Sequence, residues 1–293
     1  MDSNFPKISV VVPSFNQGEY IEDTILSVLD QDYPDFELII IDGGSTDSTI
    51  DVIRKYEDRL AYWISEPDCG QSDAINKGAE RATGEIIGWL NSDDLYYEGA
   101  LRAMGNAFID NHTAVLIYGA GAKIDVSKEI LKIIPAKPYN FKKINRVLYF
   151  LQPSMMFRLR DFIRVGGLDE NLHYVMDWDL VLKLAAIGEI VPISAPIGML
   201  RRHAGAKTIG PQWQAAVEAG MVARKHNGYL DINYLSYKVR TIVGSWDNAI
   251  CNKLLRPIVD TVFERWARKY GCLVKIWPDI NEQVQNCASQ KPL

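Results

Sequence analysis

The first 110 residues alternate between short apolar runs and longer segments in which apolar residues recur at helical spacing. The apolar runs cover residues 8–12, 37–41 and 85–90, a shorter run covers 62–65, and the helical spacing covers 19–29, 48–56 and 72–81. Consecutive Val and Ile residues are typical of strands buried on both faces of a parallel sheet. The alternation therefore predicts an α/β fold with a mostly parallel, doubly wound sheet and helices on both faces.

A polar cluster follows each of the four predicted strands. The clusters are Pro13–Asn16, Asp42–Thr46, Glu66–Asp73 and Asn91–Asp94. In doubly wound sheets the crossovers share one hand, and ligands bind beyond the carboxyl ends of the strands. The four clusters are therefore predicted to form one binding rim.

The pattern changes after residue 110. Short strands are expected at residues 115–121, 122–126, 129–135, 153–158, 191–194 and 197–203, and helices at 176–186, 212–226, 231–245 and 249–270. We expect a catalytic domain over residues 1–210, with halves 1–110 and 111–210, and a helical C-terminal extension over 211–293.

Composition narrows the class of protein. The chain has 293 residues, 47% hydrophobic and 24% charged, with a net charge of −5, which excludes a disordered chain, a coiled coil and a disulfide scaffold. The mildly acidic balance disfavours a nucleic-acid partner. None of the four cysteines forms a C-x-x-C pair. The start of the chain lacks the pattern of a signal peptide, and the apolar runs are too short to span a bilayer. A cytoplasmic protein is expected.

Two acidic segments are candidates for chemistry. In Asn91-Ser92-Asp93-Asp94, adjacent carboxylates at the end of a buried strand are costly without a cation, and Mg²⁺ or Mn²⁺ would relieve this repulsion. The alternative is a polar turn that caps a helix starting near Tyr97. Asp177 and Asp179 lie two apart, so only one can face a site. That residue is either a general base or an acid favoured by the helix dipole.

His203 follows two arginines after an apolar stretch. It is a candidate metal ligand or phosphate contact, and a structural histidine is the alternative. Arg201, Arg202 and Lys207 fit either a phosphate contact or a solvated basic turn. The chain has no dinucleotide-binding glycine motif after the first strand, no P-loop, no G-x-S-x-G elbow and no H-E-x-x-H motif.

Five stretches together resemble the inverting glycosyltransferases of family 2, which have a GT-A fold. They are ISVVVPSFNQGEYIEDTILSVLDQDYPDFELIIIDGGSTDST, GQSDAINKGAERATGEIIGWLNSDD, QPSMMFR, VGGLDENLHYVMDWDLVLKLA and RRHAGAKT, which span residues 7–208 in the family's order. The resemblance implies a nucleotide-diphosphate-sugar transferase fold and a divalent metal cofactor.

The resemblance also implies roles for individual residues. Pro13 and Asn16 border the nucleotide, Asp42 contacts the base, and Asp73 lies near the nucleoside. Asn91, Ser92 and Asp93 occupy the D-x-D metal motif, with Asn in place of the first acid, so Asp93 carries most of the metal contact. Asp94 neighbours the sugar or the metal. Asp177 corresponds to the catalytic base, although Met176 replaces the Glu that often precedes it. Gln152 lines the acceptor side and His203 the diphosphate side.

The implied function is transfer of a sugar from a nucleotide-diphosphate donor to a saccharide or lipid-linked acceptor, in surface polysaccharide or glycolipid assembly. A nucleotide-sugar binding protein without turnover is the alternative, which the two acids Asp93 and Asp177 disfavour. A nucleotidyltransferase would carry a glycine-rich basic loop, which VPSFNQGEY lacks. Residues 211–293 fall outside the resemblance. They are expected to pack on the catalytic domain or a dimer partner, or to contact the inner membrane face peripherally.

Overall fold

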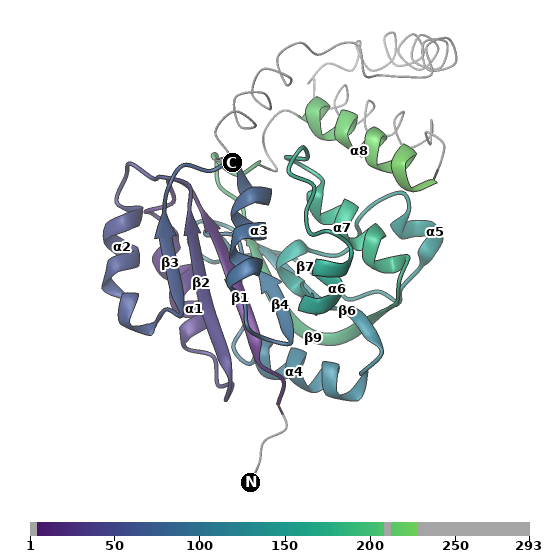
Figure 1. Cartoon of the computed structure of the whole chain (residues 1–293), viewed down its shortest axis with the longest axis horizontal. Coiled ribbons are helices and arrows are strands. Elements are labelled where there is room, and N and C mark those ends of the chain that lie inside the picture. The colour runs from purple at the N-terminus through teal and green to yellow at the C-terminus, as the bar shows by residue number, and fades with distance from the viewer. Residues whose placement is uncertain (1–4, 208–211, 228–293) are drawn as a thin grey trace. The chain divides into compact units, whose positions relative to one another are not determined.

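The computed structural model describes residues 5–207 and 212–227 (Figure 1). The chain divides into two compact units, Met1–Glu170 with Met176–Ala206 and Asn171–Val175 with Lys207–Leu293. The first unit contains the sheet. In the second, the described residues include one helix, α8 (Gln212–Asn227), which was predicted over 212–226. The helices predicted over 231–245 and 249–270 lie outside the described residues.

The first unit is built on a nine-stranded sheet with the order β3-β2-β1-β4-β8-β6-β9-β5, and β7 pairs with β6. The strands are β1 (Ile8–Ser14), β2 (Phe36–Asp42), β3 (Tyr62–Ser65), β4 (Ile86–Trp89), β5 (Leu95–Tyr96), β6 (Ala114–Ile124), β7 (Ile130–Ile134), β8 (Met155–Arg158) and β9 (Glu189–Arg201). Strands β1 to β4 are parallel. β8 runs antiparallel to β4 and β6, so the sheet as a whole is mixed. The predicted doubly wound architecture is confirmed.

Two long strands replace pairs of short strands in the prediction. Residues 115–121 and 122–126 were expected as separate strands, but β6 runs through both. Residues 191–194 and 197–203 likewise fall largely within β9. Because these stretches contain Gly and Pro residues, the sequence predicts that each strand is interrupted. In the sheet, shifts of register between β6 and β9 accommodate them without ending either strand.

Helices cover both faces of the sheet. They are α1 (Ile21–Leu29), α2 (Thr49–Lys55), α3 (Gln71–Arg81), α4 (Ala100–Asp110), α5 (Phe141–Ile144), α6 (Leu159–Arg164) and α7 (Met176–Ala185), with 3₁₀ turns η1 (Glu57–Arg59) and η2 (Gln152–Ser154). Val10 and Val12 of β1 share a core cluster with residues of α1, α2 and α4. The other face meets α3, where a Cβ on Gly78 would lie 2.3 Å from Val11 Cγ1. Figure 1 shows α3 in front of the sheet.

The parallel strands end at one edge. Ser14 of β1 pairs in register with Asp42 of β2, which pairs with Ser65 of β3. The N–H of Leu90, just after β4, donates to the carbonyl of Val11. The four polar clusters predicted from the sequence therefore begin at neighbouring strand ends, as the topology of such sheets requires.

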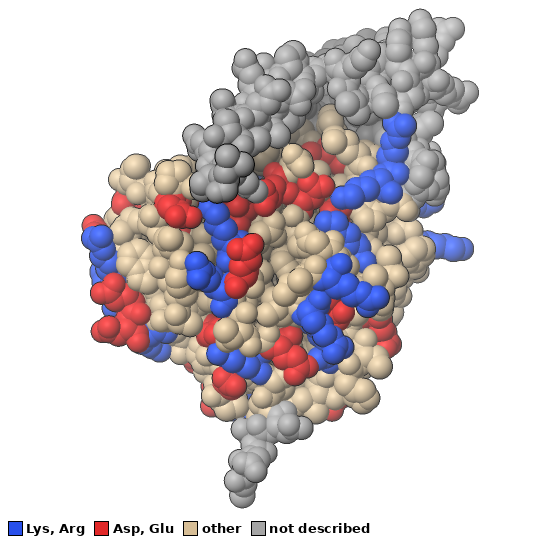
Figure 2. All heavy atoms as spheres, viewed as in Figure 1, with Lys and Arg blue, Asp and Glu red and all other residues tan. Residues whose placement is uncertain are grey.

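Charge is mixed on the face of the protein that Figure 2 shows. Acidic and basic side chains alternate over the face in Figure 2, where a band of Lys and Arg crosses the area of α6 and α7. Among the described residues, none of the helices combines the length and apolar character needed to cross a bilayer.

Candidate active site

The loops after β1 and β2 are held together by side-chain hydrogen bonds. Asn16 has a positive φ of 51°, a conformation that Asn tolerates better than most residues. Its N–H donates to Ser45 Oγ at 2.7 Å, and its Oδ1 accepts from the N–H of Thr46 at 2.9 Å. Nearby, Asp47 accepts from the N–H groups of Gly18 and Thr49. Burial acts to raise the pKa of Asp47, but these bonds hold it below its usual value.

Asp42 organises the turn after β2. Asp42 is fully buried. Its carboxylate accepts hydrogen bonds from the N–H groups of Gly44 (3.1 Å) and Ser45 (2.8 Å) and from Ser65 Oγ (2.7 Å). Ser45 Oγ also donates to it. The Asp that was predicted to contact a nucleotide base thus also fixes the shape of two loops.

Asp42→Asn is expected to lower the free energy of unfolding by about 2–3 kcal/mol, because the amide nitrogen would face donors that now share a carboxylate. Urea unfolding measures the change. Asp30→Asn removes an equal charge from an exposed ion pair with Arg59 and should cost at most about 0.5 kcal/mol. Equal effects of the two substitutions would contradict this structural role of Asp42.

The third loop, after β3, contains the acids Glu66 and Asp68, and Asp73 follows in the first turn of α3. The N–H of Cys69 donates to Asp73 Oδ2 at 2.9 Å, and Lys77 bridges Asp73 and Glu66 at 3.3 and 3.2 Å. Asp68 was not predicted as a site residue. Burial raises its pKa, and the charge of Asp73 adds to the effect. A Cβ on Gly43 would lie 2.7 Å from Asp68 Oδ2, so the second and third loops approach closely.

Asn91, just after β4, connects three separate segments. It accepts from Gln71 Nε2 at 2.5 Å and donates through Nδ2 to Asp94 Oδ2 at 3.0 Å and to Gln152 Oε1 at 3.3 Å. Gln152 in turn donates to the carbonyl of Trp89 at 2.8 Å. The predicted acceptor-side residue therefore lies directly against the predicted metal motif.

The structure rejects the alternative reading of this segment as a helix cap. Strand β5 follows it, and α4 begins only at Ala100. Asp94 is buried, and its carboxylate accepts from the N–H of Arg201 at 2.9 Å. Its backbone carbonyl accepts a hydrogen bond from Thr24 Oγ1 at 2.8 Å. Burial raises the pKa of Asp94 well above its usual value, and the neighbouring charge of Asp93 adds to this shift.

Asp93 contacts His203 across more than 100 residues of sequence. His203 Nε2 lies 2.8 Å from Asp93 Oδ2, and the two side chains are 7% and 17% exposed. The imidazole also lies against the ring of Tyr20, with centroids 4.5 Å apart. The two residues predicted as metal ligands therefore meet, although their pairing was not evident from the sequence.

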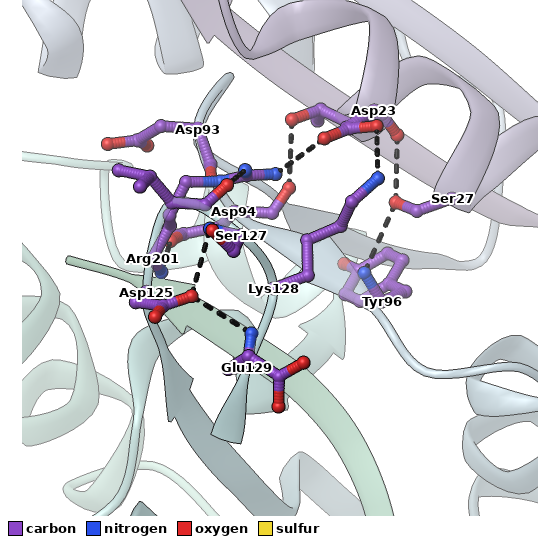
Figure 3. Close-up of polar contacts among 12 residues, drawn as sticks. Asp23, Ser27, Asp93, Asp94, Tyr96, Asp125, Ser127, Lys128, Glu129 and Arg201 are labelled. Carbon is purple, nitrogen blue, oxygen red and sulfur yellow. Dashed lines mark hydrogen bonds and ion pairs between the residues drawn. The ribbon is translucent and has the colours of Figure 1, made fainter. Parts of the chain in front are cut away.

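Arg201 joins this pair to the rest of the fold. It is buried, although the sequence also allowed a solvated basic turn, and that reading is wrong for this residue. Its guanidinium donates to the carbonyl of Asp93 (2.9 Å), the carbonyl of Val126 (3.2 Å) and Asp23 Oδ2 (2.9 Å). Figure 3 shows Asp23 between Arg201 and Lys128. Nothing in the local sequence around Asp23 indicates this role.

Asp177 lies in the first turn of α7. Its Oδ1 accepts from the backbone N–H of Trp178 at 2.7 Å. Within the described residues, no side chain donates a hydrogen bond to it. Burial raises its pKa to about 6. Asp179, the other candidate, is fully buried and pairs with Lys183 at 2.9 Å. Of the two acids, Asp179 is therefore already paired with a cation, and Asp177 is the one whose pKa is raised to about 6.

The predicted site residues form connected groups. Contacts join Asn91, Asp94 and Gln152 into one group and Asp93 with His203 into a second, with Arg201 bonded to both. Asn16 and Asp42 share the loops after β1 and β2, and Pro13 lies in register with Ile41 at the same strand ends. Asp73 lies in the first turn of α3, directly after the third loop. Asp177 has no direct bond to these residues in the described part of the chain.

Asp93 and His203 could supply two of the ligands that a divalent cation needs. Two ligands at right angles on an octahedral Mg²⁺ lie roughly 3.0 Å apart, close to the 2.8 Å between Asp93 Oδ2 and His203 Nε2. Groups of three or more acidic, His or Cys ligands are absent among the described residues. An ion held by these two residues would therefore need oxygen ligands from a bound substrate or water.

Comparison with known proteins gives a consistent family. The family model described as Glycosyl transferase family 2 matches residues 9–166. An uncharacterised glycosyltransferase of Rickettsia typhi is 28% identical over 198 residues, which cover 63% of this chain and 60% of the relative. The putative teichuronic acid biosynthesis glycosyltransferase of Bacillus subtilis is 43% identical over 100 residues, covering 33% and 40%. The chain thus spans less than two thirds of these relatives' lengths.

Solved structures show the same fold. S. aureus TarS residues 1–349 in complex with UDP-GlcNAc align with a TM-score of 0.58 and 20% identity, covering 96% of this chain and 79% of that one. A mannosyltransferase of Pyrobaculum calidifontis in complex with GDP-Man and Mn²⁺ aligns with a TM-score of 0.56 and 19% identity, covering 99% and 89%.

Proposed function

The chain belongs to glycosyl transferase family 2, and from this membership we propose that it transfers a sugar from a nucleotide-diphosphate donor to an acceptor hydroxyl, with inversion at the sugar carbon. One observation carries the proposal. Asn91, Asp94 and Gln152 form one contact network with the adjacent Asp93–His203 pair, beyond the carboxyl ends of the parallel strands. Ligands of such sheets bind at that edge.

We assign donor binding to the loops after the first three strands. Pro13 and Asn16 border the nucleotide, Asp42 lies toward the base, and Asp73 lies toward the nucleoside. The bonds between the first two loops support this assignment, because a preorganised pocket loses less freedom when the donor binds. TarS and the Pyrobaculum enzyme bind UDP-GlcNAc and GDP-Man, which favours a nucleotide-sugar donor here.

We assign a Mg²⁺ or Mn²⁺ ion to Asp93 and His203, with Asn91 and Asp94 beside it. A cation bound there would neutralise the diphosphate and stabilise charge on the leaving group. Asp94 and Arg201 hold the Asp93 segment in place through buried hydrogen bonds. The Mn²⁺ named with the Pyrobaculum enzyme supports this choice of cofactor.

We assign the general base to Asp177. Its carboxylate takes the proton from the acceptor hydroxyl, while the hydroxyl oxygen forms a bond to the sugar carbon and the nucleotide diphosphate leaves with the electrons of the broken bond. A carboxylate with a pKa of about 6 is a stronger base than an ordinary Asp and is still ionised at neutral pH. These properties favour turnover over simple nucleotide-sugar binding.

We place the acceptor on the Gln152 side of the network and assign catalysis to residues 1–210. The Bacillus relative is named for teichuronic acid biosynthesis, and a chondroitin synthase of Pasteurella multocida also matches. These names favour a saccharide or lipid-linked saccharide acceptor in surface polysaccharide or glycolipid assembly.

Nucleotide sugars with Mn²⁺ are expected to raise the melting temperature of the full chain, because a ligand that binds only the native state stabilises it by mass action. A screen across uridine, guanosine and thymidine diphosphate sugars would identify the base. The matching nucleoside without phosphates is the control and should have a much smaller effect. A melting temperature unchanged by every nucleotide sugar would contradict the proposed donor site.

A further inference from the structure

The β6–β7 hairpin exposes an unusual number of apolar side chains. Strand β7 has the sequence ILKII, and its first four residues are exposed. Ile130, Leu131 and Ile133 are 54%, 55% and 66% exposed, and Val126 in the preceding turn is 51% exposed. β7 lies off the main path of the sheet and pairs with β6. An exposed apolar strand at a sheet edge indicates an interaction surface.

The same region is basic in an acidic protein. Between Lys123 and Lys137, from the end of β6 to just past β7, the chain has four basic residues and two acidic residues, whereas the whole chain has a net charge of −5. The four are Lys123, Lys128, Lys132 and Lys137, of which the last three are exposed. We call β7, its turn and these basic residues the hairpin surface.

Two of the lysines in the hairpin oppose each other. Lys123 of β6 and Lys132 of β7 are register partners, and like charges directly opposite each other destabilise a sheet. Burial, Arg202 and Lys132 lower the pKa of Lys123. Folding therefore brings cations together here, and an anionic partner would relieve their repulsion.

The turn of the hairpin is held in a fixed position. Lys128 pairs with Asp23 at 2.7 Å, and Asp125 Oδ1 accepts from the N–H groups of Ser127 and Glu129, each at 2.9 Å (Figure 3). Arg201 donates to the carbonyl of Val126 and also to that of Asp93. The hairpin surface therefore begins beside the Asp93 segment.

We propose that the hairpin surface docks on an anionic lipid bilayer surface. Exposed Ile and Leu side chains would enter the interface between headgroups and acyl chains, and the lysines would contact acidic headgroups. A second copy of this chain fits less well, because two such surfaces would repel each other. A soluble polyanion would satisfy the lysines but would leave the apolar side chains in water.

The test is co-sedimentation of the full chain with vesicles of phosphatidylcholine alone and of equal parts phosphatidylcholine and phosphatidylglycerol. We expect sedimentation with the anionic vesicles only. The double variant Leu131→Ser, Ile133→Ser should lower the partition coefficient about tenfold or more, because two exposed apolar side chains no longer insert. Lys132→Glu should lower it about tenfold, because reversing the charge replaces attraction with repulsion.

The matched control is Ile109→Ser with Ile163→Ser. These residues are 42% and 63% exposed and lie in α4 and α6, so this variant should sediment as the wild type does. Unchanged melting temperatures would show that all variants fold.

Three results would overturn the proposal. They are equal sedimentation with neutral and anionic vesicles, equal loss in the control variant, and a wild-type dimer that the double variant converts to a monomer in light scattering. Tight heparin binding that the double variant retains, with no binding to vesicles, would instead identify a soluble polyanion. None of these results depends on whether the chain transfers sugars.

Discussion

Asp177→Asn is expected to lower sugar transfer by about 10²–10⁴-fold, because Asn has the shape of Asp but cannot accept the acceptor's proton. Donor affinity should change little, since the base acts on the acceptor. Release of the nucleoside diphosphate measures turnover, and calorimetry measures donor binding. The melting temperature should not fall, because burial already disfavours the charged carboxylate.

The pH dependence provides a second readout of the same residue. The folded pKa of about 6 lies above the ordinary value, so the base is ionised at neutral pH and becomes protonated as the pH falls through 6. Wild-type kcat/KM should therefore fall about tenfold per pH unit below that value. The Asn variant should lack this acid limb.

Asp110→Asn is the control, because it removes one carboxylate from an exposed position at the end of α4. It should leave transfer and its pH profile unchanged. Near wild-type turnover in Asp177→Asn would show that another group takes the proton.

Asp93→Ala is expected to remove the strengthening of nucleoside diphosphate binding by Mn²⁺, a loss of roughly tenfold or more in affinity. Sugar transfer should fall by about 10²–10³-fold, because charge on the leaving diphosphate is no longer stabilised. Calorimetry with Mn²⁺ and with a chelator measures the first effect. The variant should bind equally under the two conditions.

Glu98→Ala is the matched control, since Glu98 is an exposed acid five residues further along the chain. It should keep the full Mn²⁺ dependence. If wild type itself binds the nucleotide equally with Mn²⁺ and with chelator, the assignment of a cation to Asp93 and His203 is wrong. The donor-screen result would still stand, since nucleotide binding and cation binding are measured separately.

Much of the candidate site could be predicted because strand ends are visible in the sequence. The buried runs ending near Val12, Ile41 and Leu90 predicted one rim, and the parallel register confirms that these ends are neighbours. Asn91–Asp94 was predicted as a metal motif because its two adjacent acids follow such a strand, and a metal role for it stays a prediction. The choice between Asp177 and Asp179 was not available from spacing. The family resemblance favoured Asp177, and the pairing of Lys183 with Asp179 in the folded helix supports that proposal.

The sequence alone determined the doubly wound half of the fold and the order of its loops. A helix or strand that is buried on one or both faces has apolar residues at a regular spacing, and this spacing can be read from the sequence. The tertiary structure alone decided which distant groups meet. The contact of His203 with Asp93 and the bond of the buried Arg201 to Asp23 join segments 110 and 178 residues apart. The spacing of apolar residues within a segment does not predict such contacts, because they depend on how β9 returns beside the loop after β4.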